Sequence, residues 1–163
     1  MKTIIISAFP ACGKSYLFEN QSEYGISCLD SDSSEFSWVK NNKGENTKTR
    51  NPNFPNNYIE HIKDNIGKVD FIFVSSHNQV VAALNQNNIK YVKVQPSKKC
   101  KLEWIGRFWE RGNDDSFIKF ISSNWDKFTN DKGDDLRGSM VGKVILTNGE
   151  YLSDHIDYIL NDF

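Results

Sequence analysis

Nine residues near the start of the chain have the types and the order that phosphate binding requires. Residues 7–15 read Ser-Ala-Phe-Pro-Ala-Cys-Gly-Lys-Ser. In such a loop, backbone N–H groups surround a phosphate chain, the lysine reaches the outer phosphates, and the serine hydroxyl binds Mg²⁺. We therefore predict that ATP and Mg²⁺ are bound by this loop, with Ser15 as a metal ligand and with nucleotide contacts from Ala11, Cys12, Gly13, Lys14, Ser15 and Tyr16.

One position departs from the usual G-x-x-x-x-G-K-[ST] pattern. Ala8 stands where the first glycine is usual, and alanine tolerates unusual backbone angles less well than glycine. A Gly-Lys-Ser tripeptide also occurs by chance, but here it follows an apolar strand and precedes a helix, which favours the phosphate loop. Cys12 is interpreted as a small loop residue and not as a redox thiol.

Two carboxylates follow the second predicted strand. Asp30 and Asp32 are separated by one residue, so in an extended segment they point the same way. This arrangement suits one carboxylate that organises magnesium and one that contacts an acceptor group. We predict these roles for Asp30 and Asp32 respectively. The structural alternative is an ordinary Asx turn with helix capping.

Alternating strands and helices are predicted to position these residues. Short β-branched or apolar runs occupy residues 3–7, 26–29, 69–74, 89–94 and 143–147. Helical spacing follows Lys14, recurs at 58–66 and around 80–84, and then covers 99–112, 114–128 and the end of the chain. Parallel strands need crossover connections, so the order predicts an α/β fold with about five mostly parallel strands flanked by helices.

Length, charge and cysteine content limit the number of domains, the partners and the compartment that we expect. The chain has 163 residues, which fits a single domain over 1–163, and a net charge of -1, which favours neither nucleic acid nor a membrane as partner. Its three cysteines are scattered, which argues against a disulfide framework or a zinc site. The apolar run at the N-terminus is too short for a signal peptide. We expect a cytoplasmic protein, either a monomer or a homodimer.

Two segments interrupt the simple alternation. Residues 40–57 are rich in Asn and Lys and contain Pro52 and Pro55, and residues 99–128 form a predicted helix pair. Ligands of open α/β sheets lie beyond the carboxyl ends of the strands, so insertions there are candidate lids. We predict an acceptor-binding insertion at 40–66 and a helical lid at 99–128. The segment 131–138, with Arg137, has no assigned role.

Several motifs together give the chain a family resemblance over about residues 1–128. They are the phosphate loop, LDSDSS followed by FSW, RNPNFPNNYIEHI, FVSSH and WIGRFWERG. The chain resembles the small P-loop kinases of bacteriophages and Gram-positive bacteria, described as nucleoside or deoxynucleoside monophosphate kinases. The resemblance implies a P-loop NTPase fold, transfer of the ATP γ-phosphoryl group to a nucleoside monophosphate, and a lid that bears arginines.

That plan suggests roles for further residues. Arg107 and Arg111, one helical turn apart, are expected to close over the triphosphate, unless Glu103 simply pairs with Arg107 on a solvated face. Arg50 is the candidate for gripping the acceptor phosphate, or else a loop arginine in water. His77 is expected either to contact the acceptor or to be an ordinary helix-start residue. Aromatic side chains are expected either to stack on the base or to join the core, at Phe36, Trp38 and Tyr58.

Two other functions stay open. A kinase of an alcohol, such as a nucleoside, a small metabolite or a polynucleotide 5′-hydroxyl, would use Asp32 as base. A non-kinase regulator would bind ATP and signal to a protein partner. Motor ATPases are disfavoured because the strand before His77 ends in Ser-Ser, and GTPases because no Asn-Lys-x-Asp motif is present.

Overall fold

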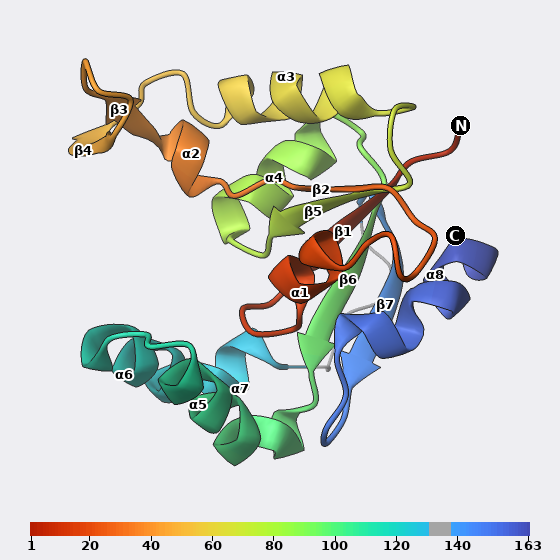
Figure 1. The fold of residues 1–163 in the computed structure, drawn as a ribbon. Helices are drawn as coiled ribbons and strands as arrows, with labels where there is room; N and C mark the ends of the chain where they lie inside the picture. The colour runs from red at the N-terminus through yellow and green to blue at the C-terminus, as the bar shows by residue number, and fades with distance from the viewer. Residues whose placement is uncertain (131–137) are drawn as a thin grey trace.

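Five parallel strands form the central sheet of the protein (Figure 1). The computed structural model describes residues 1–130 and 138–163, so the predicted segment 131–138 with Arg137 lies almost wholly outside the described residues. All neighbouring strands of this sheet run parallel. In spatial order the strands are β2 (Cys28–Asp30), β5 (Phe71–Ser75), β1 (Ile4–Ala8), β6 (Tyr91–Pro96) and β7 (Met140–Leu146). The predicted α/β fold is confirmed at this level.

The middle strand, β1, is buried along its whole length. Successive side chains of a strand point to opposite faces, and here Ile6 and Ala8 join one apolar cluster while Ile5 joins another. A strand buried on both faces needs a continuous apolar run, which is what its sequence supplies. The sheet is therefore the middle layer of three.

Helices cover both faces of the sheet (Figure 1). One face is covered by α3 (Asn56–Asn65) and α4 (Asn78–Gln86), which contribute Ile59, Ile62 and Leu84 to the cluster around Ile5. The other face is covered by α1 (Lys14–Glu19), by α8 (Ile156–Asp162) and by the turn η2 (Leu152–His155) before it. The helices predicted after Lys14, over residues 58–66, around residues 80–84 and at the end of the chain are thus present.

The segment 99–128 forms a helical subdomain beside the phosphate loop. It contains η1 (Lys98–Cys100), α5 (Lys101–Glu110), α6 (Asp115–Ser123) and α7 (Trp125–Phe128). The helix predicted over 114–128 is broken at Asn124, whose side chain donates to the Phe120 carbonyl and competes with the helical bonding pattern. Phe9 packs edge-on against Trp125, with ring centroids 5.8 Å apart. This contact joins the subdomain to the loop.

A two-stranded hairpin occupies much of the segment predicted to be an irregular insertion. It follows α2 (Ser34–Ser37) and pairs β3 (Trp38–Lys40) antiparallel with β4 (Asn46–Arg50). The Asn41 carboxamide oxygen accepts from the backbone N–H groups of Lys43 and Glu45, both at 2.9 Å, and so closes the turn. In Figure 1 the hairpin projects from the body of the molecule, next to the start of α3. Strand β3 is only three residues long and β4 is wholly polar, so neither gives the apolar alternation from which a strand is predicted.

The chain order places a crevice beside β1. From β1 the chain leads to β2 and β5 on one side, and then crosses to β6 and β7 on the other side. Ligands of open α/β sheets bind outside the carboxyl ends of the strands at such a switch point. The segments that leave these ends are the phosphate loop after Ala8, the run after Asp30 and the helices after β6.

Candidate functional site

The loop between β1 and α1 has two residues with a left-handed backbone. Ala11 has φ 62° and Gly13 has φ 97°. A Cβ atom added at Gly13 would lie 3.2 Å from the Tyr151 ring, so glycine is required there for both conformation and space. Ala8, by contrast, is a regular, fully buried residue of β1 that pairs with Ser75 and Val94. The missing first glycine therefore does not disturb the entry to the loop.

Lys14, Ser15 and Asp30 come together at the start of α1, as predicted. The Lys14 ammonium donates to the Ala8 carbonyl at 2.9 Å, and burial lowers the pKa of Lys14. The Ser15 hydroxyl donates to Asp30 Oδ2 at 3.3 Å. Burial raises the pKa of Asp30, against the opposing effects of Lys14 and the Ser15 hydrogen bond. The lysine is held inside its own loop by a backbone oxygen that an anionic ligand can replace.

The oxygen atoms of Ser15 and Asp30 are of the kind that Mg²⁺ prefers. Magnesium takes hard oxygen ligands, keeps several waters, and is usually held by one or two protein groups together with substrate phosphates. Among residues 1–130 and 138–163, no three His, Cys, Asp or Glu side chains cluster as a metal site. The residues present thus fit a magnesium ion that arrives with a nucleotide better than a dedicated protein-only site.

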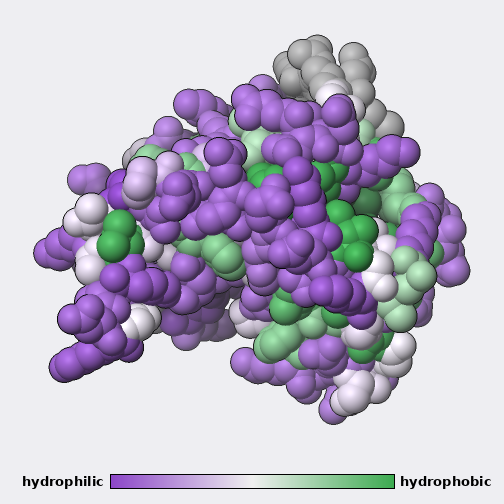
Figure 2. Space-filling view, turned by 90° about the horizontal axis from the view of Figure 1, so that it is seen from above, coloured by the Kyte–Doolittle hydropathy of each residue, from purple (hydrophilic) through white to green (hydrophobic). Residues whose placement is uncertain are grey.

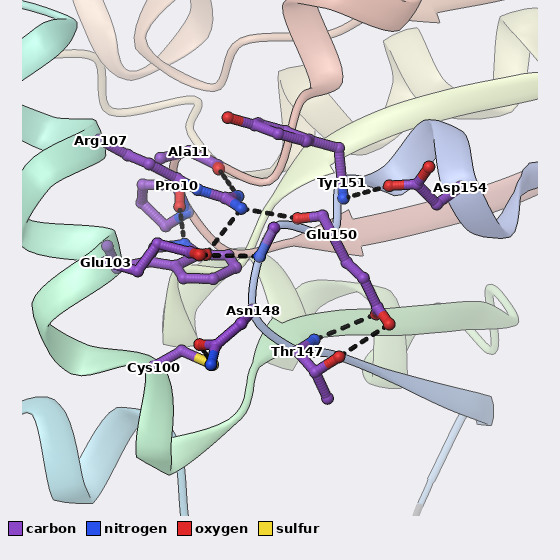
Figure 3. Close-up of polar contacts among 12 residues, drawn as sticks. Pro10, Ala11, Cys100, Glu103, Arg107, Thr147, Asn148, Glu150, Tyr151 and Asp154 are labelled. Carbon is purple, nitrogen blue, oxygen red and sulfur yellow. Dashed lines mark hydrogen bonds and ion pairs between the residues drawn. The ribbon is translucent and has the colours of Figure 1, made fainter.

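Arg107 is a fixed wall of the site (Figure 3). Its guanidinium donates to the Ala11 carbonyl at 3.0 Å and to the Glu150 carbonyl at 2.8 Å, and it pairs with Glu103 at 2.9 Å. It also lies over the Trp104 ring. The side chain is only 7% exposed. The Glu103–Arg107 pair is formed, with Arg107 buried and Glu103 30% exposed, and in this structure these contacts of the Arg107 guanidinium are all made within the protein.

A cavity of about 300 Å³ opens between the loop and the end of α5. Arg111 lies in its wall, and this arginine is exposed where Arg107 is buried. Both predicted lid arginines line this cavity, and Arg111 is the exposed one of the two. The lining is completed by the predicted nucleotide-binding residues of the loop and by three others: Ala11, Gly13, Lys14, Ser15, Tyr16, Arg107, Glu110 and Tyr151.

Cys12 faces the core and not the cavity. It is 1% exposed, and burial raises its pKa to about 12. Its carbonyl accepts from Leu152 N–H at 2.8 Å. A thiol held protonated in this way is a poor nucleophile, so the interpretation of Cys12 as a structural loop residue agrees with its surroundings.

The predicted acceptor residues lie along the run after β2. Asp32 is exposed, and one of its carboxylate oxygens accepts from Ser34 N–H at 2.9 Å, which is the Asx turn given as the alternative. Its charge also acts on Lys14, raising the pKa of the ammonium. The neighbouring Ser31 is buried and bonded through its hydroxyl to His61 Nε2 at 3.0 Å. Asp32 thus forms the turn through one carboxylate oxygen, and its charge acts on Lys14 of the phosphate loop.

Base stacking by Tyr58 is wrong for this arrangement. Tyr58 is fully buried, and its hydroxyl donates to the Ser31 carbonyl at 2.5 Å. Phe36 is partly buried and packs on Tyr58 and on His61, with ring centroids 5.2 Å and 4.7 Å away. Both rings therefore pack beneath the segment that follows β2, as part of the protein interior and not of a base-binding surface. The core alternative holds for Tyr58 and largely for Phe36.

The other acceptor candidates lie farther out. Arg50 and Trp38 face each other across the hairpin, with the guanidinium 4.8 Å from the indole centroid. Neither residue lines the cavity beside the loop. His77 is the exposed residue at the start of α4. Like Arg50 and Trp38, His77 does not line the cavity.

The turn after β7, residues 148–151, also belongs to the site; its position after the last strand permits a contact with the nucleotide but does not by itself show one. Tyr151 lies against both Gly13 and Arg107, and Glu103 accepts from Gly149 N–H at 2.7 Å (Figure 3). What position alone did not reveal is the role of the side chains: Tyr151 lines the cavity, and the Glu150 carbonyl accepts from Arg107.

Comparison of the sequence with models of protein families finds no match, and comparison with curated proteins also finds none. In the part of the chain that the structure describes, no helix is both long enough and apolar enough to cross a membrane.

Proposed function

We propose that this chain is a P-loop phosphotransferase that moves the γ-phosphoryl group of ATP to a nucleoside monophosphate, with Mg²⁺. The observation that carries the proposal is that Lys14 and Ser15 line a cavity together with Arg111 and Tyr151, with Asp30 hydrogen-bonded to Ser15. Catalysis of phosphoryl transfer is largely positioning and charge stabilisation, and these are the groups that such chemistry uses.

Each residue has a distinct task in the proposed reaction. Lys14 leaves the Ala8 carbonyl for the β- and γ-phosphate oxygens, and the loop amides hold the phosphate chain. Ser15 and Asp30 would hold the metal ion, which neutralises charge on the phosphates when bound. Arg111 stabilises the charge that develops on the transferred group. The bond from the γ-phosphorus to the β–γ bridging oxygen breaks, an acceptor oxygen bonds to the phosphorus, and ADP leaves.

A second candidate acceptor is an alcohol. The observation that favours it is the exposed Asp32 carboxylate near Lys14, because phosphorylation of a hydroxyl benefits from a base and phosphorylation of a phosphate does not. Substitution of Asp32 by Ala separates the two acceptors. A large loss of turnover with unchanged ATP binding supports the alcohol, whereas a small loss supports the monophosphate.

The test of the proposed function is ADP release in the presence of ATP and Mg²⁺, measured against a panel of acceptors. The panel holds the ribo- and deoxynucleoside monophosphates, the nucleosides and a 5′-hydroxyl oligonucleotide. Stimulation by one or two monophosphates supports the main proposal, and stimulation only by hydroxyl acceptors supports the second. ATP hydrolysis that no acceptor stimulates would contradict both and favour a nucleotide-binding regulator.

A further inference from the structure

We infer that the β3–β4 hairpin is a binding surface for single-stranded nucleic acid. The inference goes beyond the proposed phosphotransfer, which needs only the loop, the cavity and their neighbours. Residues 38–50 hold four cations and one carboxylate in a chain whose total charge is -1. The hairpin thus has an excess of three positive charges, on an element that projects from the body of the molecule.

The pairing of the two strands brings cation and aromatic ring to one face. Trp38 lies opposite Arg50, and Lys40 lies opposite Asn46. Directly paired residues share a face, so the Trp38 and Arg50 side chains stand on the same side of the hairpin, while the register shifts between Trp38 and Lys40. The Arg50 guanidinium covers the indole at 4.8 Å. Lys43 in the turn and Lys48 on β4 add two exposed charges.

This combination matches the physics of single-strand recognition. Proteins that bind single strands without sequence preference pair a positive surface that follows the phosphates with an aromatic side chain on which a base stacks. The Trp38 ring is partly exposed, with Arg50 over one face, and would offer its remaining surface to a base. The exposed cations Lys43, Lys48 and Arg50 would supply the phosphate contacts. Lys40 also pairs with Glu35 at 2.6 Å, which fixes the base of the hairpin to α2.

The surface of the hairpin suits a nucleic acid better than a lipid bilayer. Seen from above, the end of the molecule from which it projects is hydrophilic apart from a small hydrophobic spot (Figure 2). Its turn, residues 41–45, is Asn-Asn-Lys-Gly-Glu, with no apolar residue that could enter lipid. Because the hairpin adjoins α2 and the run that carries Asp32, a strand bound on it would lead toward the crevice (Figure 1).

The test is binding of a fluorescent single-stranded oligonucleotide of about twelve nucleotides, followed by anisotropy without ATP. With about three phosphate contacts, the affinity should fall with salt with a logarithmic slope of about −2. The variant Lys40→Gln/Lys48→Gln/Arg50→Gln should bind more than about tenfold more weakly at low salt, with a slope near zero. Trp38→Ala should weaken binding by at least about fivefold, and Trp38→Phe should retain most of it because a ring remains.

The matched control removes three exposed lysines elsewhere, in the variant Lys68→Gln/Lys90→Gln/Lys119→Gln. It has the same net charge as the hairpin variant and should bind like the unmodified protein. Equal weakening in both triple variants, unchanged binding in the hairpin variant, or no binding by the unmodified protein would overturn the inference. So would hairpin-dependent capture by phosphatidylserine vesicles without oligonucleotide binding. Circular dichroism checks folding, and because no turnover is measured, failure of the proposed kinase activity leaves the result readable.

Discussion

The guanidinium carbon of Arg107 lies 3.9 Å from the centroid of the Tyr151 ring. Arg107 belongs to α5 and Tyr151 to the turn after β7, and the same guanidinium also bonds to the carbonyl of Ala11 in the phosphate loop. One buried cation therefore ties three separate segments together at the wall of the site. Arg107, within α5, therefore has a structural role, whereas Arg111, directly after α5, is exposed in the cavity wall.

Removal of the Arg107 side chain should destabilise the protein strongly. Arg107→Ala leaves the Ala11 and Glu150 carbonyls and the Glu103 carboxylate without their donor, and loss of one partner of a buried pair costs about 3 kcal/mol or more. Arg107→Lys keeps the charge but cannot make all three contacts, so we expect a smaller loss. Urea unfolding measures both. A change below about 0.5 kcal/mol for Arg107→Ala, the size typical of exposed sites, would contradict this role.

Removal of the Arg111 side chain should act on turnover and leave stability nearly unchanged. Arg111 is exposed in the cavity wall, so Arg111→Ala should alter the free energy of unfolding by less than about 0.5 kcal/mol. Loss of a cation that stabilises the transferred group should lower kcat by about 10²-fold or more. Steady-state kinetics with ATP and the best acceptor decide it. Exposed Lys119→Ala on α6 serves as the charge control, and equal kcat values for Arg111→Ala and the unmodified protein would refute the assignment.

The ionised Asp30 carboxylate should lower the stability of the folded protein at neutral pH, although the proposed activity requires it. Its pKa is raised above the ordinary 3.8, chiefly by burial, so the folded protein binds the proton more readily than the unfolded chain. The folded state therefore loses stability as pH rises through the interval from 3.8 to the folded pKa, and it stays less stable above it. Asp30→Asn cannot ionise, so it should be more stable at pH 7 and lose Mg²⁺-dependent turnover.

The check on Asp30 is thermal unfolding of both proteins over a range of pH. The stability advantage of Asp30→Asn should shrink as the pH falls and disappear below the ordinary value of 3.8. Asp70→Asn is the contrasting variant. The Asp70 carboxylate accepts hydrogen bonds from the Ser27 N–H at 2.7 Å and the Ser27 hydroxyl at 2.8 Å, so this substitution should destabilise the protein. A loss of stability in Asp30→Asn at pH 7 would show that the carboxylate is structural.

Glu150 should contribute stability that acid removes. Hydrogen bonds from Thr147 N–H, His155 and the Thr147 hydroxyl lower the pKa of Glu150 to about 2 from 4.5. Its contribution is therefore complete above pH 4.5 and is lost as the pH falls toward 2. Because the side chain is one-third exposed, solvent screening limits the loss in Glu150→Gln to about 1 kcal/mol at pH 7. Urea unfolding at pH 7 and near pH 3 measures it, and an equal effect at both would contradict the linkage.

The sequence predicted the elements that carry the chemistry because their signals are local. The apolar run before the loop and the Gly-Lys-Ser triplet sit within one strand–turn–helix unit, and the alternation of strands and helices orders the sheet. The meeting of Ser15 with Asp30 also followed, because both leave carboxyl ends of strands in one parallel sheet.

What escaped prediction depends on contacts between distant segments. Arg107 became structural because Trp104, Tyr151 and two backbone carbonyls surround it, and no helical period encodes that neighbourhood. Tyr58 became core because its hydroxyl found the Ser31 carbonyl. The hairpin escaped prediction because its first strand is short and its second is polar, and because it is held by turn geometry and by cross-strand pairs such as Trp38 with Arg50.

The most direct test of the central claim follows labelled phosphate from γ-labelled ATP. The products formed with Mg²⁺ and each nucleoside monophosphate are separated, and the label is located. The account predicts label in a nucleoside diphosphate, at a rate that Lys14→Ala lowers by about 10²-fold or more. Label found only as inorganic phosphate, at a rate that no acceptor changes, would contradict it.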